Sequence, residues 1–577
     1  MNFIKTVIAV LVAQLLLGVT LFFGLVLITA LFTADEGVKV ADGSWLELDI
    51  YGQIPTYDPP ESIASSIIDT DQETLTRLLT NMEKAAADKR IEGVIMKVSS
   101  SNSLGLASMD ELREAVGRVR AAGKPVIAYS DGLDRNTLYL ASACDSIFMP
   151  DVSDLVFTGY GYVDMFAKGA LDKLDVHQNL HKIRDYKTAA EMLQRDSMSP
   201  EAREMANWLI DEVWDVELGA ISRDRGIPMA EMQGHMDHAL FDAQEALDAG
   251  FIDGMRYWDE LEEDLGGEDG LETISSDDYA DVSRAQAGLK GKQRIAVVHA
   301  YGMIGGRKSR VDPSLGTLMG HETVIRDLRA AAEDKNVAAI IFRVDSRGGD
   351  ALTSELISRE VGKIAEDKPV IVSMGDVAAS GGYAIAFRGT KIIADSLTIT
   401  GSIGSIYGKI NMAGLWNKMG VTFDWVTRGP NALLWSGVTD FDAEQWKRIE
   451  SHHDNSFQFW LNNISEARGI PMDELLPLTE GRVWTGRQAR ERRLIDDVGG
   501  YSRAVEVAKE EAGIPADEEV AFVHYPKRRG LYDLITSGDA PLTVVSWTVQ
   551  RWFKEDVAET ARLLTSGRMR VWTGVTD

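Results

Sequence analysis

Ser380 is a candidate nucleophile because only small residues surround it. It follows two alanines and precedes Gly381-Gly382, so no bulky neighbour crowds its hydroxyl. The apolar stretch 370–379 predicts a strand that ends at this serine, and a short helix is expected to begin near Gly381. Free N–H groups at the start of such a helix would point toward an oxyanion formed beside Ser380. An ordinary strand-to-helix turn without chemistry is the alternative.

A second glycine pair lies upstream, at the end of another apolar stretch. Residues 340–349 read IIFRVDSRGG, which predicts a strand followed by a turn. Glycine allows backbone amides to approach a ligand closely. Because adjacent strands of a parallel sheet end at the same edge, we expect the two glycine-rich turns to meet there.

The elements that position these turns alternate between strand and helix. The stretches 44–52, 91–98 and 125–129 have strand character, whereas 74–89 and 109–122 have apolar residues at helical spacing. This alternation predicts an α/β fold with a parallel sheet.

The same order of elements returns in the second half of the chain. The sequence RGIPM occurs at 225–229 and again at 468–472, and FID at 251–253 matches LID at 494–496. Such matches at a constant spacing indicate two tandem homologous domains. Without gaps, Ser380 aligns with Asn136, and the first half lacks both glycine turns. We therefore expect the nucleophile only in the second domain.

Three motifs together resemble a known family. RVDSRGG, ASGGY and TITGSIG, in this order and spacing, are similar to the signal peptide peptidase A (protease IV) family of serine peptidases, family S49. The long, duplicated form from Gram-negative bacteria is the most similar. The resemblance implies the ClpP/crotonase-like fold for both domains. One departure is Arg347, where the family usually has proline.

The resemblance also implies the remaining site residues. Lys187, in HKIRDYKTAA, matches the segment that carries the general-base lysine of the family. Composition alone does not distinguish Lys187 from Lys182. Ser402 would orient the lysine amine, although a strand-end serine without this role is an equal alternative. The oxyanion candidates are the backbone N–H groups of Gly349 and Gly381, with Gly348 as a third.

Composition limits the remaining possibilities. The net charge of −29 argues against nucleic acid or an anionic membrane surface as the main partner. A single cysteine, Cys144, excludes an intramolecular disulfide and a cysteine-rich metal site. The implied mechanism requires neither metal nor cofactor. None of the nine histidines lies in a motif like that of Ser380, and His452-His453 is expected to begin a solvated surface helix.

The N-terminus predicts a membrane anchor. Residues 7–32 are almost wholly apolar and exceed the roughly 20 residues that span a bilayer. Lys5 before this stretch and two acidic residues after it favour a cytoplasmic N-terminus. A cleaved signal peptide is the alternative.

The expected organisation follows from these boundaries. It comprises a cytoplasmic N-terminus (1–6), a transmembrane helix (7–32), a domain carrying the base (44–265), a linker (266–292), a domain carrying the nucleophile (293–525) and an amphipathic tail (526–577). The glycine-rich stretch 301–320 is expected to be a loop that borders the substrate groove.

The leading hypothesis is a serine endopeptidase with a Ser-Lys dyad. The resemblance implies cleaved signal peptides and other apolar peptides as substrates, a bacterial inner-membrane location with a periplasmic body, and a homo-oligomer, typically a tetramer. One alternative is a catalytically inactive membrane-anchored scaffold. Acyl-thioester chemistry of the crotonase kind is a second.

Overall fold

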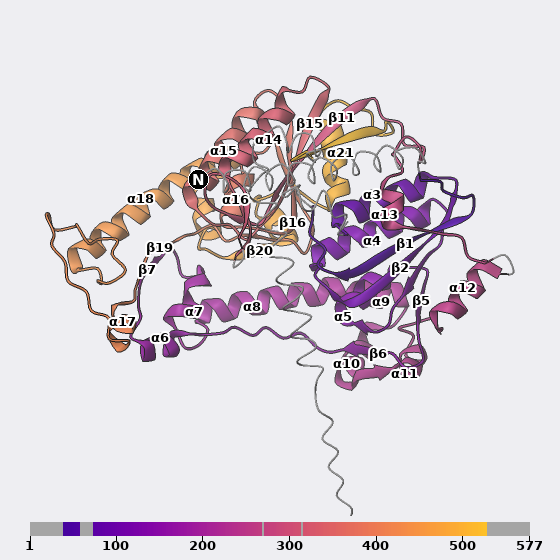
Figure 1. Cartoon of the computed structure of the whole chain (residues 1–577), viewed down its shortest axis with the longest axis horizontal. Helices are drawn as coiled ribbons and strands as arrows, with labels where there is room; N and C mark the ends of the chain where they lie inside the picture. The colour runs from indigo at the N-terminus through magenta and orange to yellow at the C-terminus, as the bar shows by residue number, and fades with distance from the viewer. Residues whose placement is uncertain (1–37, 58–72, 268–269, 313–314, 528–577) are drawn as a thin grey trace, which may run out of the picture.

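Two predominantly parallel sheets, one from each half of the chain, form the centre of the protein. The computed structural model describes residues 38–57, 73–267, 270–312 and 315–527 (Figure 1). The first sheet has six strands in the order β10-β1-β2-β3-β5-β9, and the second has eight, with β20-β18-β16-β15-β11-β22 as its main path. The expected pair of tandem homologous α/β domains is confirmed.

The N-terminal repeat comprises residues 44–280. Its strands are β1 (Ser44–Gly52), β2 (Ile91–Asn102), β3 (Val126–Tyr129), β4 (Leu133–Asp134), β5 (Ser146–Met149), β6 (Asp154–Phe157), β7 (His177–Lys182), β8 (Ala239–Asp242), β9 (Gly254–Met255) and β10 (Thr273–Ser275). Its helices are α3 (Leu75–Ala87), α4 (Leu106–Ala121), α5 (Arg135–Ala141), α6 (Lys168–Leu174), η1 (Thr188–Ala190), α7 (Glu191–Gln194), α8 (Pro200–Val213), η2 (Trp214–Leu218), α9 (Gly219–Arg225), α10 (Met229–His238), α11 (Ala243–Asp248), α12 (Trp258–Gly266) and α13 (Ser276–Ala280).

The C-terminal repeat comprises residues 293–525. Its strands are β11 (Gln293–Tyr301), β12 (Met303–Ile304), β13 (Arg310–Asp312), β14 (Gly316–Met319), β15 (Val337–Ser346), β16 (Val370–Ala379), β17 (Lys391–Ala394), β18 (Ile399–Gly401), β19 (Ile406–Asn411), β20 (Val483–Thr485), β21 (Asp497–Val498) and β22 (Val520–Tyr525). Its helices are α14 (His321–Glu333), α15 (Ala351–Ala365), α16 (Gly381–Ala386), α17 (Ala413–Lys418), α18 (Ala443–Arg468), α19 (Met472–Leu475), η4 (Leu476–Leu478), α20 (Gly486–Glu491) and α21 (Tyr501–Glu511).

Helices cover both faces of the second sheet, which explains why its central strands contain uninterrupted apolar runs. Along β11, Ala296 and Val298 belong to the apolar core that includes residues of α14 and α15. Ile295 and Val297 alternate with them and pack with residues of α21 on the opposite face. Successive side chains of a strand point to opposite faces, so an apolar side chain is needed on both sides of β11.

The predicted linker contains the last strand of the first repeat. β10 pairs in parallel with β1, just as β22 pairs in parallel with β11 in the second repeat. Ile274 of β10 and Tyr279 of α13 are buried. The stretch 266–292 is therefore not a linker throughout, because its few apolar residues complete the first core.

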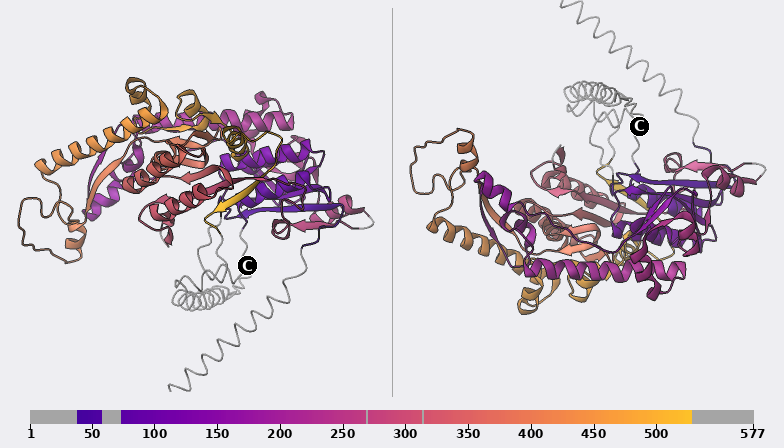
Figure 2. Two further views of the ribbon diagram at one scale, coloured as in Figure 1. Left: turned by 90° about the horizontal axis from the view of Figure 1, so that it is seen from above. Right: turned by 90° about the horizontal axis from the view of Figure 1, so that it is seen from below.

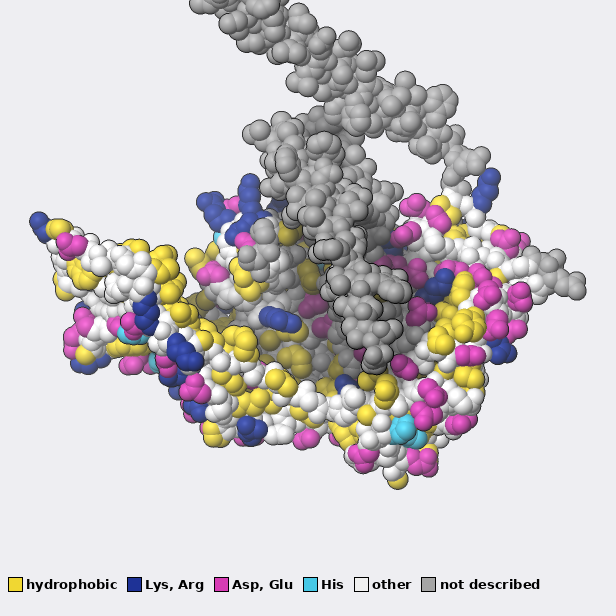
Figure 3. All heavy atoms as spheres, turned by 60° about the horizontal axis from the view of Figure 1, so that its bottom comes forward, with side chains coloured by type: hydrophobic (Ala, Val, Ile, Leu, Met, Phe, Trp, Pro, Cys, Tyr) yellow, Lys and Arg dark blue, Asp and Glu magenta, His cyan; other side chains and the backbone are white. Residues whose placement is uncertain are grey.

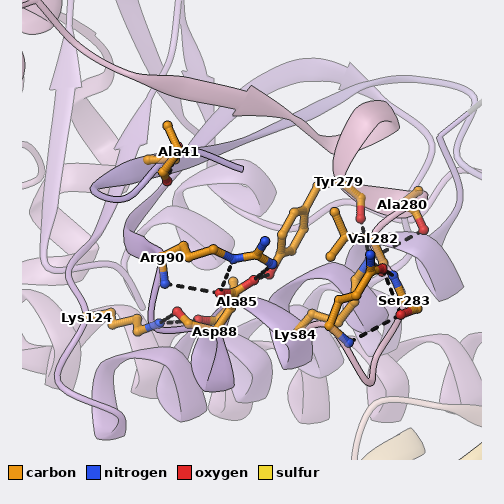
Figure 4. A network of polar contacts seen from close by, with 12 residues as sticks. Ala41, Lys84, Ala85, Asp88, Arg90, Lys124, Tyr279, Ala280, Val282 and Ser283 are labelled. Carbon is orange, nitrogen blue, oxygen red and sulfur yellow. Dashed lines mark hydrogen bonds and ion pairs between the residues drawn. The ribbon is translucent and has the colours of Figure 1, made fainter. Parts of the chain in front are cut away.

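A buried lysine fastens this segment to helix α3 (Figure 4). Lys84 is 1% exposed, and its Nζ donates hydrogen bonds to the carbonyl groups of Tyr279 and Val282. The Tyr279 hydroxyl in turn donates to the carboxylate of Asp88, 3.1 Å away. A cation at the end of α13 satisfies carbonyl groups that the helix leaves without partners.

Each repeat extends a long arm away from its sheet (Figures 1 and 2). The N-terminal arm (residues 158–213) contains α6, β7, η1, α7 and α8, and it lies along the C-terminal repeat. The C-terminal arm (residues 402–468) contains β19, α17 and α18, and its far end projects from the molecule. The two arms join where β7 pairs antiparallel with β19.

The expected membrane anchor at 7–32 and nearly all of the tail lie outside the described residues. Among the residues that are described, no helix is both long enough and apolar enough to span a bilayer. The stretch 301–320 contains β12, β13 and β14, which form a small three-stranded sheet.

Candidate active site

Ser380 stands at the junction between β16 and α16, as the sequence predicts. It is the N-cap residue of α16 and has φ 57° and ψ −116°, a conformation that non-glycine residues rarely adopt. Its own N–H donates to the carbonyl of Gly401, 2.8 Å away, which helps to hold this backbone conformation. The strained turn presents the serine side chain at the end of the strand, beside the N-terminus of the helix.

Lys187, from the N-terminal arm, reaches Ser380. Its Nζ lies 3.0 Å from Ser380 Oγ, 2.8 Å from Ser402 Oγ and 2.9 Å from the Ser402 carbonyl oxygen. The Lys187 residue is only 6% exposed, and no carboxylate is among these partners. Burial away from water lowers the pKa of Lys187 to about 8.

Three oxygen atoms surround Nζ, which matches the three N–H groups of an ammonium. In the neutral amine, two N–H groups and one lone pair would meet the same three oxygens. Ser402 offers two acceptor oxygens, so the lone pair remains for the hydroxyl proton of Ser380. Lys182 differs sharply, because its Nζ lies 3.0 Å from the Glu191 carboxylate and forms an ion pair with it. Of these two lysines, Lys187 is the one placed beside Ser380.

Two glycines make room for the segment that carries Lys187. Gly404 ends the motif TITGSIG, whereas the sequence analysis missed Gly481. A Cβ atom on Gly481 would lie 2.6 Å from both the N and the Cβ atoms of Lys187. A Cβ atom on Gly404 would lie 2.7 Å from the Ile183 carbonyl oxygen. Gly481 also has φ 86°, which favours glycine. No local sequence signal identifies Gly481, because the clash arises between segments that are distant in the chain.

The two glycine-rich turns meet beside Ser380. A Cβ atom on Gly348 would lie 2.5 Å from the Gly381 nitrogen, and one on Gly381 would lie 2.9 Å from the Gly349 nitrogen. Within the described part of the chain, neither the Gly349 nor the Gly381 N–H donates a hydrogen bond. The Gly348 N–H instead donates to Ser346 Oγ, 3.1 Å away, so Gly348 is not available as a third oxyanion donor.

The small sheet after β11 supports the Gly349 turn. Ile304 of β12 forms a parallel bridge with Gly349, in which the Ile304 N–H donates to the Gly348 carbonyl and its own carbonyl accepts from Asp350. The stretch expected to be a loop thus fixes one wall of the site. Arg347, which stands where the resemblance leads us to expect proline, has an exposed side chain.

An aromatic stack holds the N-terminal arm against the C-terminal repeat. The Arg482 guanidinium lies 3.7 Å from the ring centre of Trp208 and 4.7 Å from that of Tyr186, the residue before Lys187. The Glu204 carboxylate accepts hydrogen bonds from the Arg482 guanidinium, at 3.0 Å, and from the Tyr186 hydroxyl, at 2.7 Å. The Arg482 carbonyl also accepts a hydrogen bond from the Ser402 N–H. The cluster therefore contacts both the segment that carries Lys187 and the turn that carries Ser402.

The histidines lie elsewhere. His453 is buried within α18, which corrects the expectation of a solvated pair, and its Nε2 lies 2.6 Å from Ser405 Oγ. Burial and the adjacent His181 ring lower the pKa of His453 to about 4. In the described residues, no group of three or more His, Cys, Asp or Glu side chains is arranged to hold a metal ion.

Comparison with known proteins assigns the family. The family model described as Peptidase family S49 matches the chain twice, over residues 118–272 and 363–515. This chain belongs to peptidase family S49. It is a serine peptidase, and each match to the S49 model lies within one repeat.

Named relatives agree with membership of family S49. "Serine protease SPPA, chloroplastic" from Arabidopsis thaliana is 34% identical, over 84% of this chain and 72% of the relative. "Protease 4" from Haemophilus influenzae is 31% identical, over 74% of this chain and 71% of the relative.

A smaller solved protein also aligns with this S49 peptidase. It is a mutant of the 1510-N membrane-bound stomatin-specific protease, and it is 16% identical, with a TM-score of 0.26 over 41% of this chain and 99% of that chain.

Proposed function

We propose that this S49 peptidase cleaves peptide bonds with a Ser380-Lys187 dyad. The observation that carries the proposal is the 3.0 Å contact between Ser380 Oγ and a buried lysine amine without a carboxylate partner. Serine is a weak nucleophile at its ordinary pKa and needs an adjacent base. A lysine shielded from water loses its proton more readily and can serve as that base.

The proposed reaction has two halves. Neutral Lys187 accepts the hydroxyl proton while Ser380 Oγ attacks the peptide carbonyl carbon. The resulting oxyanion accepts hydrogen bonds from the N–H groups of Gly349 and Gly381. When the C–N bond breaks, the Lys187 ammonium returns its proton to the leaving amine, and an ester to Ser380 remains. Water then attacks this ester and gives a proton to Lys187; the ester bond to Ser380 Oγ breaks, the new peptide carboxyl group leaves, and the proton returns to Ser380 Oγ.

Ser402 positions the base in this scheme. Its side-chain and carbonyl oxygens both accept from Lys187 Nζ, which directs the lone pair of the neutral amine toward Ser380. Ser402 has φ 51°, so its carbonyl and side chain are presented to the same atom by an unusual backbone conformation.

The substrate and location extend this proposal. We infer extended apolar peptides, including cleaved signal peptides, as substrates, since the motifs resemble those of signal peptide peptidases. The apolar stretch 7–32 would anchor the protein in the bacterial inner membrane, with its body in the periplasm, close to such peptides. A homo-oligomer, such as a tetramer, would complete the assembly.

Labelling with a fluorophosphonate probe tests the dyad. The full-length wild type should be labelled on Ser380, while Ser380→Ala and Lys187→Ala should each lose labelling almost entirely, because the two groups act as a unit. Labelling that survives Lys187→Ala would overturn the assignment of the base. A wild type that never reacts and never cleaves a peptide would instead favour the inactive scaffold.

A further inference from the structure

The N-terminal repeat keeps the backbone frame of the active site without its serine. In the C-terminal repeat, the parallel pairing of β16 with β18 places Val377 opposite Ile399. In the N-terminal repeat, β4 pairs with β6 in the same way, and Leu133 lies opposite Leu155. The offset between the repeats is the same on both strands, since 377 − 133 and 399 − 155 are each 244. The turns that follow these strands therefore correspond residue by residue.

A cation contacts the counterparts of two active-site residues. At the offset of 244, Asn136 corresponds to Ser380, and Thr158 corresponds to Ser402. The guanidinium of Arg135 donates to both counterparts, from Nη2 to Asn136 Oδ1 at 3.0 Å and from Nη1 to the Thr158 carbonyl at 3.1 Å. In the active site, the amine of the proposed base contacts the corresponding serine side chain and the corresponding carbonyl group. A cationic side chain thus fills the same place in both repeats.

The two cations differ in what else they touch. In the described residues, no carboxylate is among the hydrogen-bond partners of Lys187, whereas Arg135 Nε lies 3.1 and 3.2 Å from the two carboxylate oxygens of Glu217. The Tyr160 hydroxyl donates to the same carboxylate at 2.7 Å. Many carboxylates of this protein lie on its surface (Figure 3), but Glu217 is 0% exposed. Because an arginine stays protonated, this turn holds a fixed, buried ion pair and not a base.

The helix that carries Glu217 leads back to the active site. α8, η2 and α9 follow one another without a break, and Figure 1 shows α8 running from α7 to α9. Near the start of α8, Glu204 accepts a hydrogen bond from the hydroxyl of Tyr186 at 2.7 Å, and Tyr186 directly precedes Lys187. The two glutamates are 217 − 204, or 13, residues apart, which is about 20 Å of helix. One helix therefore joins the buried ion pair to the residue beside the proposed base.

The π turn η2 places Glu217 against the N-terminal repeat. Its first residue, Trp214, packs on the Tyr160 ring, with the ring centres 5.5 Å apart. Glu212, two residues before η2, forms an ion pair with Arg487 of the C-terminal repeat. A π turn widens a helix locally and is frequent at functional sites. η2 therefore lies where the helix passes from one repeat to the other.

We propose that Arg135 is a positioning residue for Lys187. By holding Glu217, the arginine fixes the far end of the helix whose near end holds Tyr186, and it thereby keeps the lysine amine in its shielded place beside Ser380. It acts through α8 and not by contact with the reacting atoms. The turn that lost the nucleophile thus supports the active site of the other repeat. The inference rests on the proposed role of Lys187 as the base.

Neutral variants of the ion pair test this role. Arg135→Gln and Glu217→Gln each remove one charge but keep a side chain that forms hydrogen bonds. In the full-length protein, we expect probe labelling of Ser380 to be about tenfold slower below the midpoint of its pH profile. The midpoint should also rise above about 8, because a lysine that loses its shielding regains a higher pKa. Arg135→Lys keeps the charge and should retain more of the rate, and it provides the same comparison if the neutral variants do not fold.

Lys84→Met is the matched control. Lys84 is another buried cation of the N-terminal repeat, but it bonds the carbonyl groups of Tyr279 and Val282. This variant should lose thermal stability while its labelling midpoint stays near that of the wild type. A wild-type rate and midpoint in the variants of the ion pair, or an equal shift in the control, would overturn the positioning role. Labelling that persists in Lys187→Ala would instead overturn the proposed dyad.

Discussion

Lys187 Nζ lies 3.0 Å from Ser380 Oγ although 193 residues separate them in the chain. The lysine comes from the arm of the N-terminal repeat and the serine from the sheet of the C-terminal repeat. Each repeat alone therefore lacks half of the proposed dyad. In the proposed dyad, the C-terminal repeat supplies the nucleophile and the N-terminal repeat supplies the base.

Activity should rise with pH around the pKa of the buried lysine. Burial lowers the pKa of Lys187 to about 8, so the amine is neutral above this pH and protonated below it. Because only the neutral amine accepts a proton, kcat/KM should fall about tenfold per pH unit well below pH 8 and level off above it. Peptide cleavage from about pH 6 to about pH 9.5 measures this. A profile with its midpoint below about pH 6 would point to a histidine.

Replacement of Gly481 should remove activity through the position of Lys187. Gly481→Ala would place a methyl group 2.6 Å from Lys187 atoms, and we expect kcat/KM to fall by about 100-fold or more. Gly513→Ala is the matched control, since Gly513 has φ 68° but no atom within 4 Å of its Cβ position. Equal losses in the two variants would mean that backbone strain, not the clash with Lys187, is responsible.

Arg482 should matter for catalysis although it does not touch Ser380. Arg482→Lys keeps the charge but loses the planar stack on Trp208 and the contact with Tyr186. We expect about a tenfold lower rate of probe labelling at Ser380, because Lys187 follows Tyr186 directly. Arg307→Lys, at an exposed arginine, should react like the wild type. A normal labelling rate in Arg482→Lys would exclude this positioning role.

A buried ion pair joins the two repeats and should control stability. Arg343 donates to both carboxylate oxygens of Glu111, at 2.7 and 2.8 Å, and both side chains are at most 3% exposed. Glu111→Ala leaves the arginine charge buried and should destabilise the protein by about 3–5 kcal/mol. The double variant Glu111→Leu/Arg343→Met should recover much of this loss. Thermal unfolding measures both, and a single variant as stable as wild type would contradict the prediction.

Much of the fold was predictable because its signals are local. Alternating strand and helix patterns, and the repeat of RGIPM, depend only on neighbouring residues and spacing. They predicted two homologous α/β domains and placed Ser380 at a strand-to-helix turn. The acidic, weakly periodic composition of 266–292 predicted a linker and gave no sign of β10, since three residues suffice for a strand when a neighbouring strand edge is available.

The sequence by itself determined the repeat, the turn at Ser380 and, through resemblance, the choice of Lys187 as the proposed base. Only the tertiary structure distinguished Lys187 from Lys182 by physical means, because one amine is buried against hydroxyl oxygens and the other pairs with Glu191. It also revealed Gly481 and the Arg482 stack, since both act across segments that meet only after folding. Burial and close approach depend on the packing of the whole chain, so residue type and spacing do not encode them locally.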